Sequence, residues 1–328
     1  LARRFTASRP SPQGGGGRAP RLSLHMTLIL EQLLNGLQLG VMLFLLAAGL
    51  TLVFGIMGVI NLAHGSLYMV GAYAAALAAK LTGSFLLAIP AGLVAAALTG
   101  MAVEYLVIRH LYARDHLDQV LATFGLILFF NQTIILLFGR QPLFVQIPPA
   151  LSGAVDLGLF PYPLYRLCII AAGLLSAIGL YILIQRTRLG MLVRAGATHR
   201  DMVQALGVDI RLLTTIVFGL GALLAGFAGL MAGPLLSVQV GMGEQILILT
   251  FVVVVIGGLG SVAGAFWGAM LVGLVDTILR AFLPHILRGL MAGSEADALA
   301  SGISAMGVYL LMALVLLIKP KGLFPGHA

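Results

Sequence analysis

The sequence has little charge. Charged residues make up 9% of its 328 residues and hydrophobic residues 60%, whereas a soluble domain usually carries about 25% charged residues. The mean hydropathy of +1.07 excludes a soluble globular protein. Because each crossing of a bilayer needs about 20 apolar residues, the chain has room for several membrane-spanning helices.

Cysteine and catalytic motifs are also scarce. The single cysteine, Cys168, lies in an apolar stretch, so neither a disulfide framework nor a cysteine-based metal site can form within one chain. The sequence contains no Gly-x-x-x-x-Gly-Lys-[Ser/Thr] phosphate loop, no His-Glu-x-x-His pair and no Gly-x-Ser-x-Gly elbow. We therefore expect no enzyme, no metal site and no cofactor bound by this chain.

The basic excess is concentrated at the N-terminal end. Five of the 19 basic residues precede Met26, so the pI of 10.1 gives no support to nucleic-acid binding. Residues 1–25 are rich in Pro, Gly, Ser and Arg and lack the apolar core of a signal peptide. We expect them to be a disordered or extraneous tail, with a basic targeting arm as the alternative, and residues 26–328 to form a single transmembrane domain.

The apolar stretches predict an all-α polytopic membrane protein with about eight transmembrane helices. Glycine-rich breaks at Gly55–Ser66 and at Gly257, Gly258 and Gly260 predict discontinuous helices, and the piece before the second break is a possible ninth, partial span. At membrane depth such breaks must be lined by protein or water. The expected spans lie within 32–79, which holds two of them, and at roughly 85–108, 119–138, 164–184, 212–232, 262–282 and 303–318.

The sequence also predicts two loops between spans, one ion pair and one closely packed helix. Arg140–Pro163 contains five prolines and few basic residues, which is typical of an external loop, and Pro284–Gly302 is expected to be a polar loop. Asp276 and Arg280 are four residues apart and can pair on one helix face. Small residues in the span 212–232 favour close helix packing; they are Gly219, Gly221, Gly226 and Gly229.

The polar segment 186–211 lies between two expected spans. Its five arginines place it in the cytoplasm by the positive-inside tendency. Thr198 and Asp201 fit a capping box and Gly207 a helix stop, with a helix of about eight residues between them. One face of this helix can fill a groove on a partner; a loop lying on the membrane surface is the alternative. The candidate contact residues are Arg194, Ala195, Thr198, Asp201, Met202, Ala205, Leu206 and Gly207.

Polar residues at membrane depth are candidates for a translocation path. A metal site at His64 is not expected, because no second ligand lies at helical spacing. The alternative for Asn61 and His64 is that they only hydrogen-bond neighbouring helices. The path candidates are Gly55, Asn61, His64, Gly65, Ser66 and Glu244.

Four collinear segments resemble the branched-chain amino acid ABC importer permease family, and more narrowly its H-type (LivH-like) subunit. They are GLTLVFGIMGVINLAHGSLYMVGAY (49–73), RLGMLVRAGATHRDMVQALGVD (188–209), VVVVIGGLGSVAGAFWGAMLVG (252–273) and KPKGLFP (319–325). The similarity extends from Met26 to the last residue.

The resemblance implies a permease subunit in the bacterial inner membrane that imports branched-chain amino acids or a related small polar solute. It implies a second, LivM-like permease subunit or a homodimer, two LivG/LivF-like ATPase subunits that hold ATP and Mg²⁺, and a periplasmic solute-binding protein. It assigns residues 194–209 to the segment that couples to the ATPase. The alternatives are a urea or short-amide ABC permease of the same family, a secondary transporter with a broken-helix binding site, and a scaffold protein.

Overall fold

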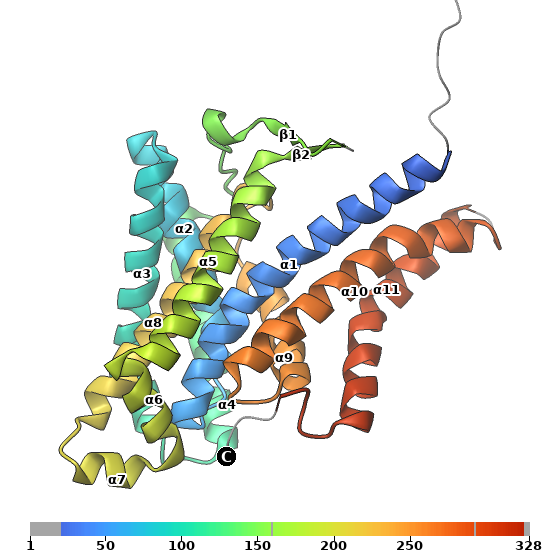
Figure 1. Cartoon of the computed structure of the whole chain (residues 1–328). Helices are drawn as coiled ribbons and strands as arrows, with labels where there is room; N and C mark the ends of the chain where they lie inside the picture. Colours follow the sequence, from blue (N-terminus) through green and yellow to red (C-terminus); the bar gives the residue numbers. More distant parts are fainter. Residues whose placement is uncertain (1–20, 159, 292, 325–328) are drawn as a thin grey trace, which may run out of the picture.

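The computed structural model describes residues 21–158, 160–291 and 293–324, with side chains from Met26 onward. Helices account for most of these residues (Figure 1). The elements are α1 (Arg21–Met57), α2 (His64–Thr82), α3 (Phe85–Leu106), η1 (Ile108–Leu111), α4 (His116–Phe138), η2 (Pro149–Leu151), β1 (Ala154–Asp156), β2 (Pro161–Pro163), α5 (Leu164–Arg186), α6 (Arg188–Thr198), α7 (Arg200–Ala205), α8 (Ile210–Ala232), α9 (Met242–Gly257), α10 (Val262–Arg288) and α11 (Gly293–Ile318).

The helices confirm an all-α polytopic membrane protein. Seven of the described helices are long and apolar enough to cross a bilayer: α1, α3, α4, α5, α8, α10 and α11. Helix α2, with 19 residues, is the eighth expected crossing, and α9, with 16 residues, is the expected partial one. The chain leaves the helical conformation at both predicted breaks, between α1 and α2 and between α9 and α10.

The core lies around α1 and α8. The middle of α1, residues 41–53, is buried throughout, and α1 packs most extensively against α10 and α8. Glycines also allow α8 and α2 to pack closely, as the small residues of the span 212–232 predicted. Gly226 of α8 lies against Gly71 of α2, where a methyl group on either residue would overlap its neighbours. Most of α11 and of α3 to α5 faces outward, and their exposed leucines and phenylalanines form the kind of surface that contacts lipid.

The two ends of the bundle differ. We call the end that carries α6, α7 and the C-terminal end of α11 the lower face, and the end that carries β1 and β2 the upper face (Figure 1). Helix α1 begins at the upper face and ends at the lower face. The N-terminal end of α1 and the C-terminal end of α11 therefore lie at opposite faces, an arrangement that the sequence left undetermined.

The expected loop 140–163 contains a short antiparallel hairpin. Val155 of β1 pairs with Tyr162 of β2, and the buried Tyr162 hydroxyl donates to the side-chain oxygen of Asn35 in α1, at 3.0 Å. A backbone bridge between Leu143 and Val238 joins this segment to the connection before α9. These contacts fix the upper face to the helix bundle.

Two expected boundaries are wrong. The predicted loop Pro284–Gly302 is mostly helical: α10 continues through Pro284 to Arg288 and α11 begins at Gly293. A proline near the end of a helix costs only one hydrogen bond, and the two polar helix ends are joined by Arg288 Nε and Asp297 Oδ1, 2.8 Å apart. The predicted pair of Asp276 and Arg280 is confirmed, at 2.8 Å.

Helix α1 begins at Arg21, so the last five residues of the predicted tail 1–25 are helical. The rest of the predicted tail, residues 1–20, lies outside the described residues.

Candidate functional site

The segment 186–211 forms two short helices on the lower face. Thr187 begins α6, and its side-chain oxygen accepts a hydrogen bond from the Gly190 amide at 3.1 Å, as expected of an N-cap residue. On α6, Val193 is buried, and on α7 the inward residue is Val203, which is 5% exposed. One apolar residue on each helix thus anchors the segment to the bundle.

The predicted capping box at Thr198 is wrong. Thr198 is the last residue of α6, and its hydroxyl donates back to the Arg194 carbonyl at 3.0 Å. Helix α7 begins after His199, whose side chain makes no capping hydrogen bond. The local pattern failed because α6 occupies Thr198, a helix that the sequence did not predict. Gly207, with φ of +84°, ends this region in the left-handed conformation that glycine adopts readily.

The residues predicted to contact a partner share one property: each is exposed in the structure. Met202 and Leu206 are 63% and 79% exposed, and, because they are four residues apart, one partner surface can cover both side chains. The full predicted set is Arg194, Ala195, Thr198, Asp201, Met202, Ala205, Leu206 and Gly207. The fold presents these residues together, and whether they bind a partner stays a prediction.

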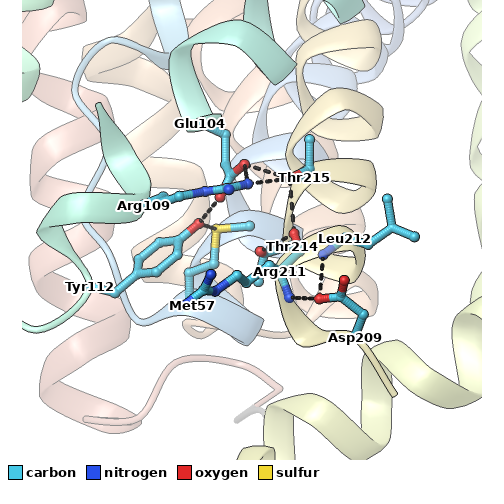
Figure 2. A network of polar contacts seen from close by, with 9 residues as sticks. All are labelled: Met57, Glu104, Arg109, Tyr112, Asp209, Arg211, Leu212, Thr214 and Thr215. Atoms are coloured by element: carbon cyan, nitrogen blue, oxygen red, sulfur yellow. Dashed lines mark hydrogen bonds and ion pairs between the residues drawn. The ribbon is translucent and has the colours of Figure 1, made fainter. Parts of the chain in front are cut away.

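A buried carboxylate lies against the first turns of α8, the helix that follows this segment in the chain (Figure 2). Glu104, near the end of α3, has no exposed surface. Its Oε1 accepts from the Tyr112 hydroxyl at 2.8 Å, and its Oε2 accepts from Arg109 Nη2 at 3.0 Å and from the Thr215 hydroxyl of α8 at 2.6 Å. A buried charge is tolerated only when it is paired and hydrogen-bonded, and Glu104 meets both conditions.

The same contacts fix the protonation of its neighbours. Burial, assisted by the hydrogen bond to Glu104, raises the pKa of Tyr112 above its ordinary value. The Tyr112 hydroxyl therefore stays protonated and donates a hydrogen bond to the Glu104 carboxylate. The hydrogen bond to Glu104 also raises the pKa of Arg109, so the guanidinium remains charged.

The sequence did not identify this cluster as a site. Glu104 lies near the end of the expected span 85–108, and Arg109, Tyr112 and Thr215 match no site motif in the sequence. Glu104 and Thr215 are 111 positions apart, and a single sequence contains no pattern that pairs them. A carboxylate in the last turn of an apolar helix, followed five residues later by arginine, is the one local hint.

The polar residues of the first break are buried inside the bundle. Asn61 and His64 have no exposed surface and Ser66 is 3% exposed. The Asn61 side-chain oxygen accepts from the Ala63 amide at 3.0 Å, a local turn that asparagine favours. Asn61 therefore shapes the break that separates α1 from α2.

The glycines of this break allow backbones to touch. Gly65 lies against Gly243 of α9 so closely that a methyl group on Gly65 would overlap the Gly243 carbonyl. Gly55, in the last turn of α1, faces the backbone of Gly260. The start of α2 is therefore packed tightly against α9, and the part of the break in a translocation path stays a prediction.

Glu244, the remaining path candidate, lies in the first turn of α9. Its Oε1 accepts from the Asn131 side-chain amide of α4 at 2.6 Å. Glu244 is half-buried, so its carboxylate lies between the interior and the surface of the bundle. This contact spans 113 positions of sequence.

The second break is confirmed at the three predicted glycines. Gly257 ends α9, and Gly258 and Gly260 have positive φ of +105° and +79°. The amides of Leu323 and Phe324 donate to the last carbonyls of α9, at 2.8 and 3.0 Å. Residues 323 and 324 therefore cap α9, so the segments 252–273 and 319–325, which are distant in the sequence, are in contact in the fold.

Comparison with known proteins agrees with this architecture. The family described as "branched-chain amino acid transport system / permease component" matches residues 32–318. The chain is 29% identical to the high-affinity branched-chain amino acid transport system permease protein BraD of Pseudomonas aeruginosa, over 90% of this chain and 95% of BraD. It is 27% identical to LivH of Escherichia coli, over 92% of this chain and 97% of LivH.

A more distant organism has a similar protein. The chain is 27% identical to the probable branched-chain amino acid transport permease protein LivH of Methanocaldococcus jannaschii, over 86% of this chain and 88% of that protein. No solved structure matches the chain. The match to the family model covers most of the chain, and the helices have the number and apolar character of a multi-pass membrane protein. The chain belongs to the family of branched-chain amino acid transport system permease components.

Proposed function

We propose that this chain is the membrane permease subunit of an ATP-driven importer and that α7 with its flanking residues is the contact for an ATPase subunit. The observation that carries the proposal is the exposure of Met202 in α7 and of Leu206, the residue that follows α7, at the lower face. An isolated helix of six residues is marginal in water, and a partner that covers these two side chains would stabilise it.

The charge distribution supports a cytoplasmic lower face. Basic residues gather at this end of the bundle, as the positive-inside tendency expects of the cytoplasmic side. The upper face, with its hairpin, then faces the periplasm and is the surface for a solute-binding protein. The basic residues at the lower face are Arg109, Arg114, Arg186, Arg188, Arg194, Arg200, Arg211, Lys319 and Lys321.

The transported solute is proposed from the relatives. BraD and LivH are named for branched-chain amino acid transport, so we propose a branched-chain amino acid or a related small polar solute. The bacterial inner membrane is the proposed location, with a second permease copy or a homologous permease subunit beside this chain. ATP and Mg²⁺ would bind to two partner ATPase subunits, and no cofactor is assigned to this chain.

The test places a charge at the proposed contact. Met202→Asp and Leu206→Asp introduce a carboxylate where an apolar side chain would be buried, and we expect co-purification of the ATPase and ATP-driven uptake to fall about tenfold or more, as for a central interface residue. Uptake is measured with radiolabelled leucine in proteoliposomes that contain the full complex.

Met291→Asp, an exposed position between α10 and α11, is the matched control and should retain ATPase binding. Normal ATPase binding and uptake by Met202→Asp would contradict the coupling role. Uptake driven by an ion gradient without ATPase subunits would instead support a secondary transporter.

A further inference from the structure

The Glu104 cluster is placed between the proposed ATPase contact and the membrane helices. Helix α7 packs mainly on its neighbours α6 and α8. It also makes one polar contact with another part of the fold: the Arg200 guanidinium lies over the Tyr112 ring, 5.2 Å from its centre. A cation at this distance from an aromatic face is attracted to it.

Tyr112 therefore has two neighbours of different kinds. Its ring supports Arg200 of α7, and its hydroxyl donates to Glu104 of α3. The same hydroxyl lies 3.4 Å from the sulfur of Met57, the last residue of α1 before the break. One side chain thus touches α7, α3 and the end of α1.

Glu104 connects this side chain to two further segments. Arg109 and Thr215 hydrogen-bond the same carboxylate and also each other, at 3.0 Å between Nη2 and Oγ1. Figure 2 shows that the side chains from α3, η1 and α8 converge on the Glu104 carboxylate. Arg109 Nε has no hydrogen-bond partner among the described residues, but both oxygens of the Glu104 carboxylate are bonded. Because a buried hydrogen-bonded network restricts the arrangements of the groups that form it, these segments are held in one relative position.

We propose that Glu104 and Tyr112 are positioning residues that fix α7 to the lower ends of α1, α3 and α8, so that displacement of α7 is transmitted to these helices. The inference rests on the proposed function, since it takes α7 to be where the ATPase acts. It adds that the permease has a specific internal connection behind this contact, built on a buried carboxylate.

The first experiment examines this chain alone in lipid nanodiscs. Tyr112→Phe keeps the ring under Arg200 but removes the hydroxyl that Glu104 holds. We expect amide hydrogen exchange in residues 200–206 to accelerate about tenfold, the factor that corresponds to one hydrogen bond to a charged group. Exchange in the middle of α3 and α8 should be unchanged. Unchanged exchange in 200–206 would overturn the proposal.

Tyr105→Phe is the matched control. Tyr105 is on the same helix as Glu104 and is 59% exposed. Its ring lies under the Arg109 guanidinium, 4.5 Å from the ring centre, and phenylalanine keeps that ring contact. The same chemical change at this position should leave exchange in 200–206 as in the wild type. Equal acceleration by both variants would show a general loosening of the fold and would overturn the proposal.

The second experiment measures coupling in the reconstituted complex with its ATPase subunits. Tyr112→Phe should retain ATPase binding and ATP hydrolysis, while the amount of leucine taken up per ATP hydrolysed falls about tenfold. A simple folding defect would lower uptake and hydrolysis together. An unchanged ratio would overturn the inference, whatever Met202→Asp does; normal uptake by Met202→Asp would overturn the proposed function, whatever Tyr112→Phe does.

Glu104→Gln provides a second route to the same conclusion. The amide retains an oxygen for Tyr112 but removes the charge that pairs with Arg109. We expect the same loss of uptake per ATP, and the double variant with Tyr112→Phe should be no worse than the more impaired single variant, because residues that act as one unit are not additive. Additive losses would show that the two residues act independently and would overturn the proposal.

Discussion

At the scale of single residues, polarity along the sequence indicated which side chains are unusual but not what they do. Asn61 and His64 were singled out by their residue type in an apolar region, and both are fully buried. Glu244 was singled out in the same way, and its partner Asn131 is on another helix. The position of each residue in depth, and its partner, came only from the packing of distant segments.

A substitution at Glu244 tests its predicted place on the translocation path. Glu244→Gln preserves an oxygen for the Asn131 amide, so insertion and stability should be close to wild type. If the carboxylate attracts the ammonium group of an amino acid, uptake should fall by about tenfold, since a charge-assisted hydrogen bond is about twice as strong as a neutral one. Initial rates of leucine uptake in proteoliposomes provide the measurement.

The control for this change is Glu295→Gln, which makes the same substitution at an exposed carboxylate in the first turn of α11. Its uptake should match the wild type. Equal rates for Glu244→Gln and the wild type would remove Glu244 from the list of path residues.

At the scale of elements, hydrophobic runs predicted where the helices lie, but they predicted the ends of several helices poorly. The runs predicted α8 within two residues at its start, and both glycine breaks are confirmed. The polar helix ends around 284–302 were mistaken for a loop, because a polar helix outside the apolar layer has no hydrophobic run to mark it. The capping pattern at Thr198 failed for a related reason: α6, an amphipathic helix on the lower face, already included that residue.

Close helix packing through glycine gives a prediction at this scale. Gly71→Ala places a methyl group against the backbone of Gly226, and we expect the free energy of unfolding to fall by about 1–3 kcal/mol, the usual cost of overpacking. The midpoint of thermal unfolding in detergent should decrease accordingly.

Gly125→Ala is the matched control within α4, where an added methyl group meets nothing within 4 Å. Because alanine is the better helix former, this variant should unfold at the same temperature as the wild type or a higher one. A midpoint for Gly71→Ala as high as that of Gly125→Ala would show that α2 and α8 can separate without loss of stability.

At the scale of the whole molecule, all four family-like segments have a part at the lower face. The segment 319–325 caps the end of α9 in the segment 252–273, and the segment 188–209 forms α6 and α7 at the same end. Helix α1, which opens the fourth segment, also ends there. This convergence gives the lower face a dense set of backbone contacts, while most of α11 faces outward.

The orientation of the chain gives the last prediction. In a Cys168→Ser background, Asp156→Cys on the hairpin and Gln204→Cys on α7 lie at opposite faces. A membrane-impermeant maleimide should label Asp156→Cys in intact spheroplasts and Gln204→Cys only after the membrane is opened. Labelling of Gln204→Cys from outside would contradict the cytoplasmic placement of α7, and with it the proposed ATPase contact.

The sequence by itself determined the class of the protein, the approximate spans, the two breaks and the family. The class, the spans and the breaks depend on local composition and periodicity, which each segment carries alone, and the family is indicated by the resemblance of four collinear segments. Only the tertiary structure decided that Glu104 is enclosed by Arg109, Tyr112 and Thr215, that the C-terminal residues cap α9, and that the first break is buried. Each of these features depends on contacts between segments that are far apart in the chain. Such contacts form, and stabilise the fold, only when the helices pack together.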